Sequence, residues 1–142
     1  MVLKMLEEYC LELMKKGKRI DGREFLQYRK IEVIPGIIKR AEGSASVKIG
    51  NTHVIAGVKL EVGKPFPDTP EEGILIVNAE FPPLASPEFE MGPPGEDAIE
   101  LARVVDRAIR SAEAIPLEKL FIESEKVWCV FVDLHVMNDD GN

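Results

Sequence analysis

Three arginines recur along one predicted helix at a spacing that suits anion binding. Arg103, Arg107 and Arg110 stand at positions i, i+4 and i+7, so at about 100° per residue they fall within an arc of roughly 60°. A guanidinium group is planar, and its paired N–H donors match two phosphate oxygens. The alternative is that the arginines form ion pairs on a solvent-exposed face. Glu100 lies three residues before Arg103, and Asp106 lies four residues before Arg110; both spacings allow ion pairs on a helix. Because charged helix faces usually face solvent, spacing alone favours this alternative.

A second possible site lies in the last apolar segment. Asp133 and His135 alternate with apolar residues there and so share one face of a predicted strand. An Asp/His pair can move protons, but no Ser or Cys nucleophile is recognisably placed with it, and a strand face at a subunit contact would look the same. His53, Cys10 and Cys129 add no recognised metal-ligand spacing. The residues therefore predict no catalytic, cofactor or metal site.

The arginines belong to the clearest helix of the sequence, residues 96–112. This segment begins with acidic side chains, which the helix dipole favours, and Pro116 follows its end. Its buried side is expected to consist of Ala98, Leu101, Ala102, Val105 and Ala108. A second amphipathic helix is predicted over residues 3–16.

Four stretches have the composition of β-strands. They are residues 28–34, 44–62, 73–81 and 127–137. Within the second stretch, Gly50-Asn51 predicts a two-residue hairpin turn, which requires positive φ.

Two further expectations concern the core and a loop. Trp128 and Phe131 are expected in the core because they lie within an apolar strand. Residues 82–95 hold five prolines and two glycines, and a loop this long is usually functional, disordered or held by a partner.

Together these elements predict an α+β fold, a mixed sheet with helices packed on one side. The strand over 127–137 is followed only by residues 138–142. An apolar strand left at the end of the chain would be an exposed edge. We therefore expect the sequence to be a truncated piece of a longer protein, or a chain whose partner covers that strand.

Composition excludes several classes of protein. The 142 residues carry a net charge of −7, which argues against a globally basic nucleic-acid binder. Residues 1–50 hold 11 Lys/Arg against 7 Asp/Glu, whereas residues 51–142 hold 7 against 18, so a polyanion must be met by a local patch or a shared groove. The apolar runs are too short to span a membrane and the first residues do not resemble a secretory signal. Two cysteines are consistent with a reducing, cytoplasmic location.

An ordered set of short segments resembles the RNase PH family of phosphorolytic exoribonucleases. The set runs through RIDGR (19–23), GSA (43–45), GNTHVI (50–55), VNAEF (77–81), ELARVVDRAIRS (100–111) and DGN (140–142). The resemblance covers nearly the whole chain. It implies a ribosomal protein S5 domain 2-like fold, with residues 1–142 as the N-terminal part of a single RNase PH-like domain.

Within that family, the chain is most similar to the non-catalytic ring subunit of the archaeal exosome. Glu96 and Asp97 stand where the active paralogue has an arginine pair that holds RNA, and two carboxylates there would repel a phosphate. Active members continue past the position of Gly141 with a phosphate-binding loop and, further on, acidic residues, whereas only Asn142 follows here. The resemblance thus implies that this chain is not itself an enzyme.

The same resemblance implies partners and a role for the arginines. Arg103 and Arg107 match positions that reach RNA in the ring, and Arg110 lies one turn further along. With the resemblance included, the phosphate-facing interpretation of these three residues is favoured. The expected partners are a catalytic RNase PH-like subunit in a hetero-hexameric ring, RNA-binding cap subunits and single-stranded RNA. The expected role is to support the partner's active site and guide RNA for degradation from the 3′ end.

Two other functions stay open from the sequence. One is a free-standing phosphate-dependent 3′-to-5′ exoribonuclease, which would need anion-binding residues after Gly141 and carboxylates beyond them. The other is an oligomer-forming domain without a nucleic-acid role, in which the loop over 82–95 and the strand over 127–137 serve subunit contacts.

Overall fold

The computed structural model describes residues 2–141, which divide into two compact units between Lys30 and Ile31. In the first unit, helix α1 spans Val2–Lys15, which confirms the helix predicted over residues 3–16. Gly17 follows it with a φ of +69°, a left-handed conformation that glycine adopts without steric cost.

The RIDGR segment of the first unit forms a turn around Asp21. Arg23 Nε donates a hydrogen bond of 2.7 Å to the Asp21 carboxylate, and Arg29 Nε lies 3.7 Å from the same oxygen. The bond from Arg23, more than any other interaction, lowers the pKa of Asp21 below its ordinary value.

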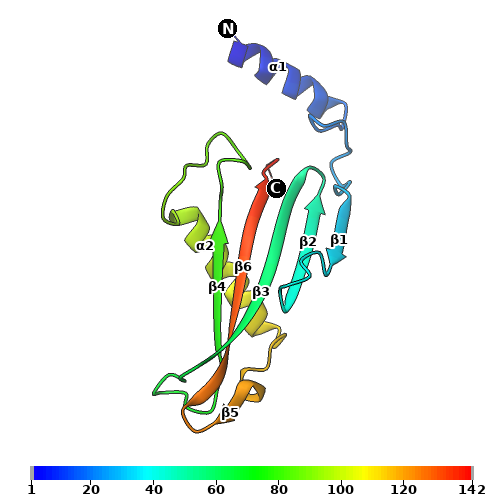
Figure 1. Ribbon diagram of the computed structural model, residues 1–142. Helices are drawn as coiled ribbons and strands as arrows, with labels where there is room; N and C mark the ends of the chain where they lie inside the picture. The colour runs from blue at the N-terminus through cyan, green and yellow to red at the C-terminus, as the bar shows by residue number, and fades with distance from the viewer. Residues whose placement is uncertain (1, 142) are drawn as a thin grey trace. The chain divides into compact units, whose positions relative to one another are not determined.

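The second unit is built on one mixed sheet with the strand order β1-β2-β3-β6-β4 (Figure 1). The strands are β1 (Ile31–Pro35), β2 (Gly43–Ile49), β3 (Thr52–Gly63), β4 (Ile74–Glu80) and β6 (Lys126–Asn138). Strands β1, β2, β3 and β6 pair antiparallel in turn, whereas β4 runs parallel to β6. A parallel neighbour needs a crossover connection, and helix α2 (Glu96–Ser111) supplies it.

The hairpin between β2 and β3 turns as the sequence predicts. Ile49 pairs with Thr52, so Gly50 and Asn51 form a two-residue link. Gly50 has a φ of +62°. A positive φ at the first central position is typical of the type II′ turn, which fits the right-handed twist of the strands.

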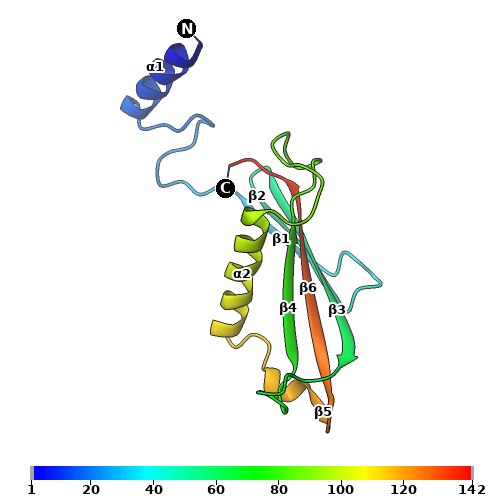
Figure 2. The same cartoon turned by 90° about the vertical axis from the view of Figure 1, so that its left-hand side faces the viewer.

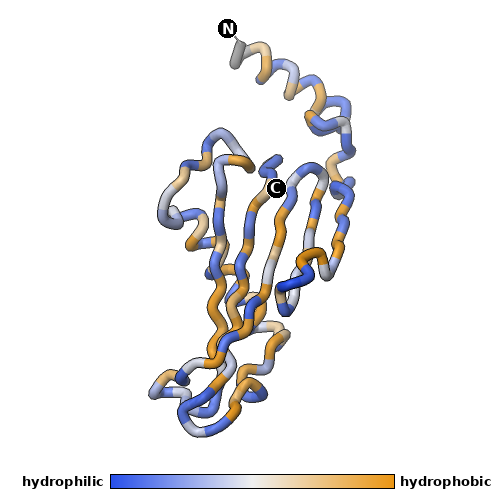
Figure 3. The backbone as a smooth tube through the Cα atoms, in the orientation of Figure 1, coloured by the Kyte–Doolittle hydropathy of each residue, from blue (hydrophilic) through white to orange (hydrophobic). Residues whose placement is uncertain are grey.

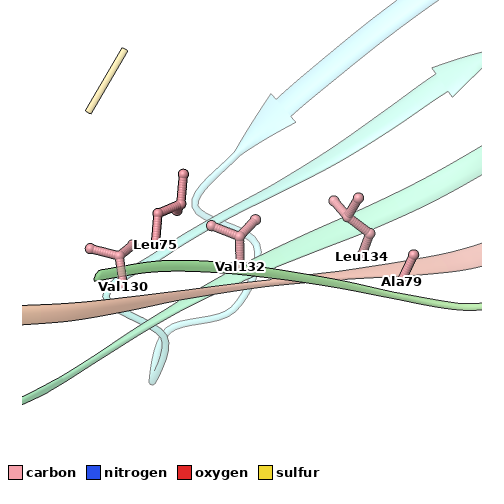
Figure 4. Close-up of a cluster of buried hydrophobic side chains, with 5 residues drawn as sticks. All are labelled: Leu75, Ala79, Val130, Val132 and Leu134. Atoms are coloured by element: carbon pink, nitrogen blue, oxygen red, sulfur yellow. The ribbon is translucent and has the colours of Figure 1, made fainter. Parts of the chain in front are cut away.

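The core lies between the sheet and α2. Leu75 and Ala79 of β4 cluster with Val130, Val132 and Leu134 of β6 (Figure 4). The helix residues packed against this cluster are Leu101, Ala102, Val105 and Ile109. Figure 2 shows α2 along this face of the sheet, and Figure 3 shows apolar residues running along β3, β4 and β6. The α+β fold with a helix packed on one side is thereby confirmed.

One side of α2 differs from the expectation. Ala98 is buried as predicted, but Ala108 is exposed, and Ile109 packs on the core in its place. At about 100° per residue, Ile109 returns to within roughly 20° of Ala98, whereas Ala108 lies about 80° away.

The expectation for β6 was wrong in two respects. It is not an edge strand, since β3 and β4 flank it on its two sides. Trp128 is 38% exposed, whereas Phe131 is partly buried. Trp128 pairs with Val62, which is itself exposed, whereas its chain neighbours Val127 and Cys129 are buried in a second cluster with Ile74.

The remaining differences concern short segments. Strand β1 begins at Ile31 rather than at residue 28. A 3₁₀ helix over Leu117–Leu120 and the strand β5 (Phe121–Glu123), which pairs with β6, were not predicted from the sequence. Residues 82–95 contain no helix or strand, as their proline content predicts.

Candidate nucleic-acid interface

Helix α2 holds the arginines on a rigid element. Ala98 is buried near its N-terminus, and Ile109 packs on the core near its C-terminus. Leu101, Ala102 and Val105 pack on the same core, so the helix is fixed to the sheet from Leu101 to Ile109 and its N-terminal turn is buried at Ala98. The polar face that carries the arginines is held in a defined orientation, as a binding site requires.

Arg103 and Arg107 face an open cleft between α2 and β4. Both side chains are exposed. With Val77, Asn78 and Ala79 they line a cavity of about 450 Å³. Among residues 2–141, the structure gives neither guanidinium a hydrogen bond or an ion pair. We call the exposed surface of Arg103 and Arg107, with this cleft, the arginine cleft.

The ion-paired alternative holds for only part of the predicted stripe. Arg110 Nε donates to both carboxylate oxygens of Asp106, at 2.9 and 3.1 Å. A terminal N–H of Arg110 also donates to the main-chain carbonyl oxygen of Leu75 at 3.2 Å. Glu100, by contrast, is not bonded to Arg103. Arg103 and Arg107 are therefore without a partner among the described residues, whereas Arg110 is held by Asp106 and by β4.

Acidic side chains border the arginine cleft toward the N-terminus of α2. Glu96 and Glu100 line a second hollow of about 460 Å³ together with Arg103 and Arg107. Glu96 and Asp97 also border a third cavity of about 900 Å³ formed by the loop over residues 82–95. The local field therefore changes sign along the helix, and anions are favoured only near the arginines.

The loop over residues 82–95 is held at two points. The rings of Phe81 and Phe89 lie 4.9 Å apart between centroids. The main-chain N–H of Asp139, just after β6, donates to the carbonyl oxygen of Ala85 at 3.1 Å, and Ala85 is buried. These contacts fix part of the wall of the third cavity.

Asp133 and His135 lie on the sheet face opposite α2, away from the arginine cleft. Asn78 Nδ2 donates to Asp133 at 3.2 Å, and Glu80 lies 3.3 Å from His135 Nδ1. Each contact joins residues that the parallel register of β4 and β6 places side by side. The two side chains are thus cross-strand partners of β4 rather than members of a nucleophile-bearing triad.

The described residues contain neither a cluster of metal ligands nor a membrane-spanning helix. Within residues 2–141, no three His, Cys, Asp or Glu side chains are grouped so as to hold a metal ion. No helix described in the structure is long and apolar enough to cross a bilayer. Burial raises the pKa of the Cys129 thiol, which makes its thiolate scarce at neutral pH.

Sequence reasoning missed the contribution of β4 to the arginine cleft. Val77, Asn78 and Ala79 come within the cleft only because β4 lies beneath α2. The sequence held no signal for this contribution, because the Asn78 amide donates to Asp133 on the opposite sheet face and the other residues of the run Ile74–Ala79 are apolar. The hydrogen bond from Arg110 to the carbonyl oxygen of Leu75 could not be predicted from the sequence, because every residue has a main-chain carbonyl.

Comparison with known proteins places this geometry in a family. The 3′ exoribonuclease family, domain 1 (RNase PH) matches residues 27–142. The exosome complex component Rrp42 of Archaeoglobus fulgidus is 60% identical over 95% of this chain and 52% of its own length. The protein of the same name from Methanocella arvoryzae is 56% identical over 99% of this chain and 55% of its own.

Solved structures give the same result. A chain of the Archaeoglobus fulgidus exosome, solved with RNA bound to the active site, matches with a TM-score of 0.91 and 56% identity, over 99% of this chain and 56% of that one. A chain of an archaeal exosome core matches with a TM-score of 0.82 and 51% identity. The present chain spans about half the length of the curated relatives it matches. On sequence and on fold, the chain belongs to the RNase PH family.

Proposed function

We propose that this chain is the N-terminal part of an RNase PH-like domain in a non-catalytic subunit of an archaeal exosome ring. In this role it supports the active site of a catalytic RNase PH-like partner and guides single-stranded RNA toward it. The assignment to an exosome is supported by the similar proteins that are named exosome components. We propose further that the ring is a hetero-hexamer, that RNA-binding cap subunits join it, and that the complex is cytoplasmic.

The observation that carries the proposal is the unpaired state of Arg103 and Arg107. Two like charges four residues apart on a helix repel each other by a few tenths of a kcal/mol. Among the described residues neither guanidinium forms an ion pair that would offset this repulsion. A phosphodiester in the arginine cleft would offset it and accept charge-assisted hydrogen bonds. Such contacts position a strand and carry no sequence information.

The acidic start of α2 supports the non-catalytic part of the proposal. A helix N-terminus would ordinarily favour a phosphate, but Glu96 and Asp97 occupy the first turn. Their charges oppose the approach of a second phosphate there. RNA would then meet α2 at its middle, where Arg103 and Arg107 lie, rather than at its N-terminus.

The test is RNA decay by the full-length protein, alone and with its catalytic partner, with and without inorganic phosphate. We expect no decay by the protein alone, and phosphate-dependent shortening from the 3′ end by the complex. Phosphate-dependent decay by the purified full-length protein alone would overturn the proposal in favour of a free-standing exoribonuclease. Binding to the partner without any RNA contact by this subunit would favour the oligomer-forming function.

A further inference from the structure

Asp106 lies among the arginines that form the proposed RNA surface. Its side chain lines the same 450 Å³ cavity as Arg103 and Arg107. It follows Arg103 by three residues, a helical spacing at which a carboxylate and a guanidinium can pair. In the structure its carboxylate is instead held by Arg110, at 2.9 and 3.1 Å.

We propose that Arg110 is a positioning residue that keeps Asp106 away from Arg103 and Arg107, so that these two remain free for phosphate. This inference rests on the proposed function of the arginine cleft. It gives Arg110 a role different from that of a third phosphate ligand, and it explains why one arginine of the stripe is paired while two are not.

The hydrogen bonds of Arg110 support this role. Its Nε–H is directed at the carboxylate of Asp106, and one terminal nitrogen is directed at the carbonyl oxygen of Leu75. Leu75 is a buried residue of β4, so the guanidinium ties α2 to the sheet. The bond to Leu75 restricts the guanidinium independently of Asp106, so the side chain loses less further entropy when it holds Asp106.

Without Arg110, the carboxylate of Asp106 would weaken RNA binding in two ways. It could pair with Arg103 one turn away, and it would repel any phosphate that entered the cleft it lines. The Asp106 side chain is 28% exposed, so solvent screens these effects only in part. A partly exposed ion pair is worth up to about 1 kcal/mol, which corresponds to a loss of about two- to fivefold in affinity.

A double-mutant cycle separates the two roles of Arg110. The variants are Arg110→Met, Asp106→Asn and the double variant, made in the full-length protein and assembled into its complex. Methionine removes the charge and keeps an unbranched chain, and asparagine keeps the shape of aspartate without its charge. The measurements are the dissociation constant for single-stranded RNA and its dependence on salt.

The proposal predicts that Arg110→Met weakens binding about two- to fivefold and that adding Asp106→Asn restores both the affinity and the salt slope. If Arg110 only contacts phosphate, or acts only by tying α2 to β4, Asp106→Asn changes the affinity by the same factor with and without Arg110, and the double variant stays weaker than Asp106→Asn alone by the factor lost in Arg110→Met. For a direct contact its salt slope is also lower by about 0.7. Either result, or an unchanged affinity for Arg110→Met, would overturn the proposal.

A reference variant separates this inference from the proposed function. The double substitution Arg103→Ala and Arg107→Ala is measured in the same series. If it leaves RNA binding unchanged, the proposed function fails. If it weakens binding while the cycle shows no recovery, only the role assigned to Arg110 fails.

Discussion

Replacing both Arg103 and Arg107 by alanine is expected to weaken binding of single-stranded RNA to the assembled complex by tenfold or more at about 0.1 M salt. Each phosphate contact to a single strand contributes about 0.7 to the slope of log K against log salt, so two lost contacts flatten the slope by about 1.4. The measurement is RNA affinity at several salt concentrations between about 50 and 300 mM.

The complex should remain assembled in that variant. Both side chains are exposed and unpaired among the described residues, and alanine has the highest helix propensity. A control removes two other exposed cations away from the arginine cleft: Lys64 just after β3, which pairs with Glu125, and Lys126 at the start of β6, which pairs with Glu123. This control should leave the salt slope near that of the unmodified complex. An unchanged slope in the arginine variant, with the complex intact, would contradict the role of the arginine cleft.

The substitution Leu75→Ala is expected to reduce the free energy of unfolding by about 2–5 kcal/mol. Leu75 is 5% exposed and lies in the core cluster that α2 covers. Removing a buried leucine side chain loses its transfer free energy and leaves a cavity that the surroundings fill only in part. Urea unfolding followed by circular dichroism measures the effect.

The chain offers the same substitution at an exposed position as a control. Leu84 lies in the loop over residues 82–95 and is 74% exposed, so Leu84→Ala should change the free energy of unfolding by no more than about 0.5 kcal/mol. Equal effects of the two substitutions would show that the packing of α2 on β4 does not stabilise this fold. That packing would then not be what holds Arg103 and Arg107 in position.

Local patterns predicted most of the elements. The bounds of α2 differ from the predicted helix by one residue, and the hairpin turn at Gly50-Asn51 forms as its composition indicates. These features depend on contacts between residues close in sequence: helix spacing, the acidic first turn and a glycine with positive φ. Sequence reasoning handles such features well because their causes are local.

The arrangement of the strands could not be predicted in the same way. The pairing of Gly57 with Asp133 and of Asn78 with Asp133 joins residues far apart in the chain. No local pattern shows that the last strand inserts between β3 and β4. The prediction of an exposed terminal strand was wrong for that reason, and so was the expectation that Trp128 is buried.

The site was predicted in outline and not in detail. Helical spacing placed Arg103, Arg107 and Arg110 on one face, and the structure keeps them there. Spacing could not show that Arg110 is held by the carbonyl oxygen of Leu75, because that contact depends on how α2 packs on β4. Whether the three residues contact RNA remains a prediction.

Photo-crosslinking of single-stranded RNA to the intact complex tests the central claim most directly. RNA carrying a photoreactive base is bound to the complex containing the full-length protein, irradiated and digested, and the crosslinked peptides are identified by mass spectrometry. We predict crosslinks within residues 100–112, the segment of α2 that carries Arg103 and Arg107. RNA crosslinked elsewhere in the complex, with none in that segment, would contradict the claim that this helix faces RNA.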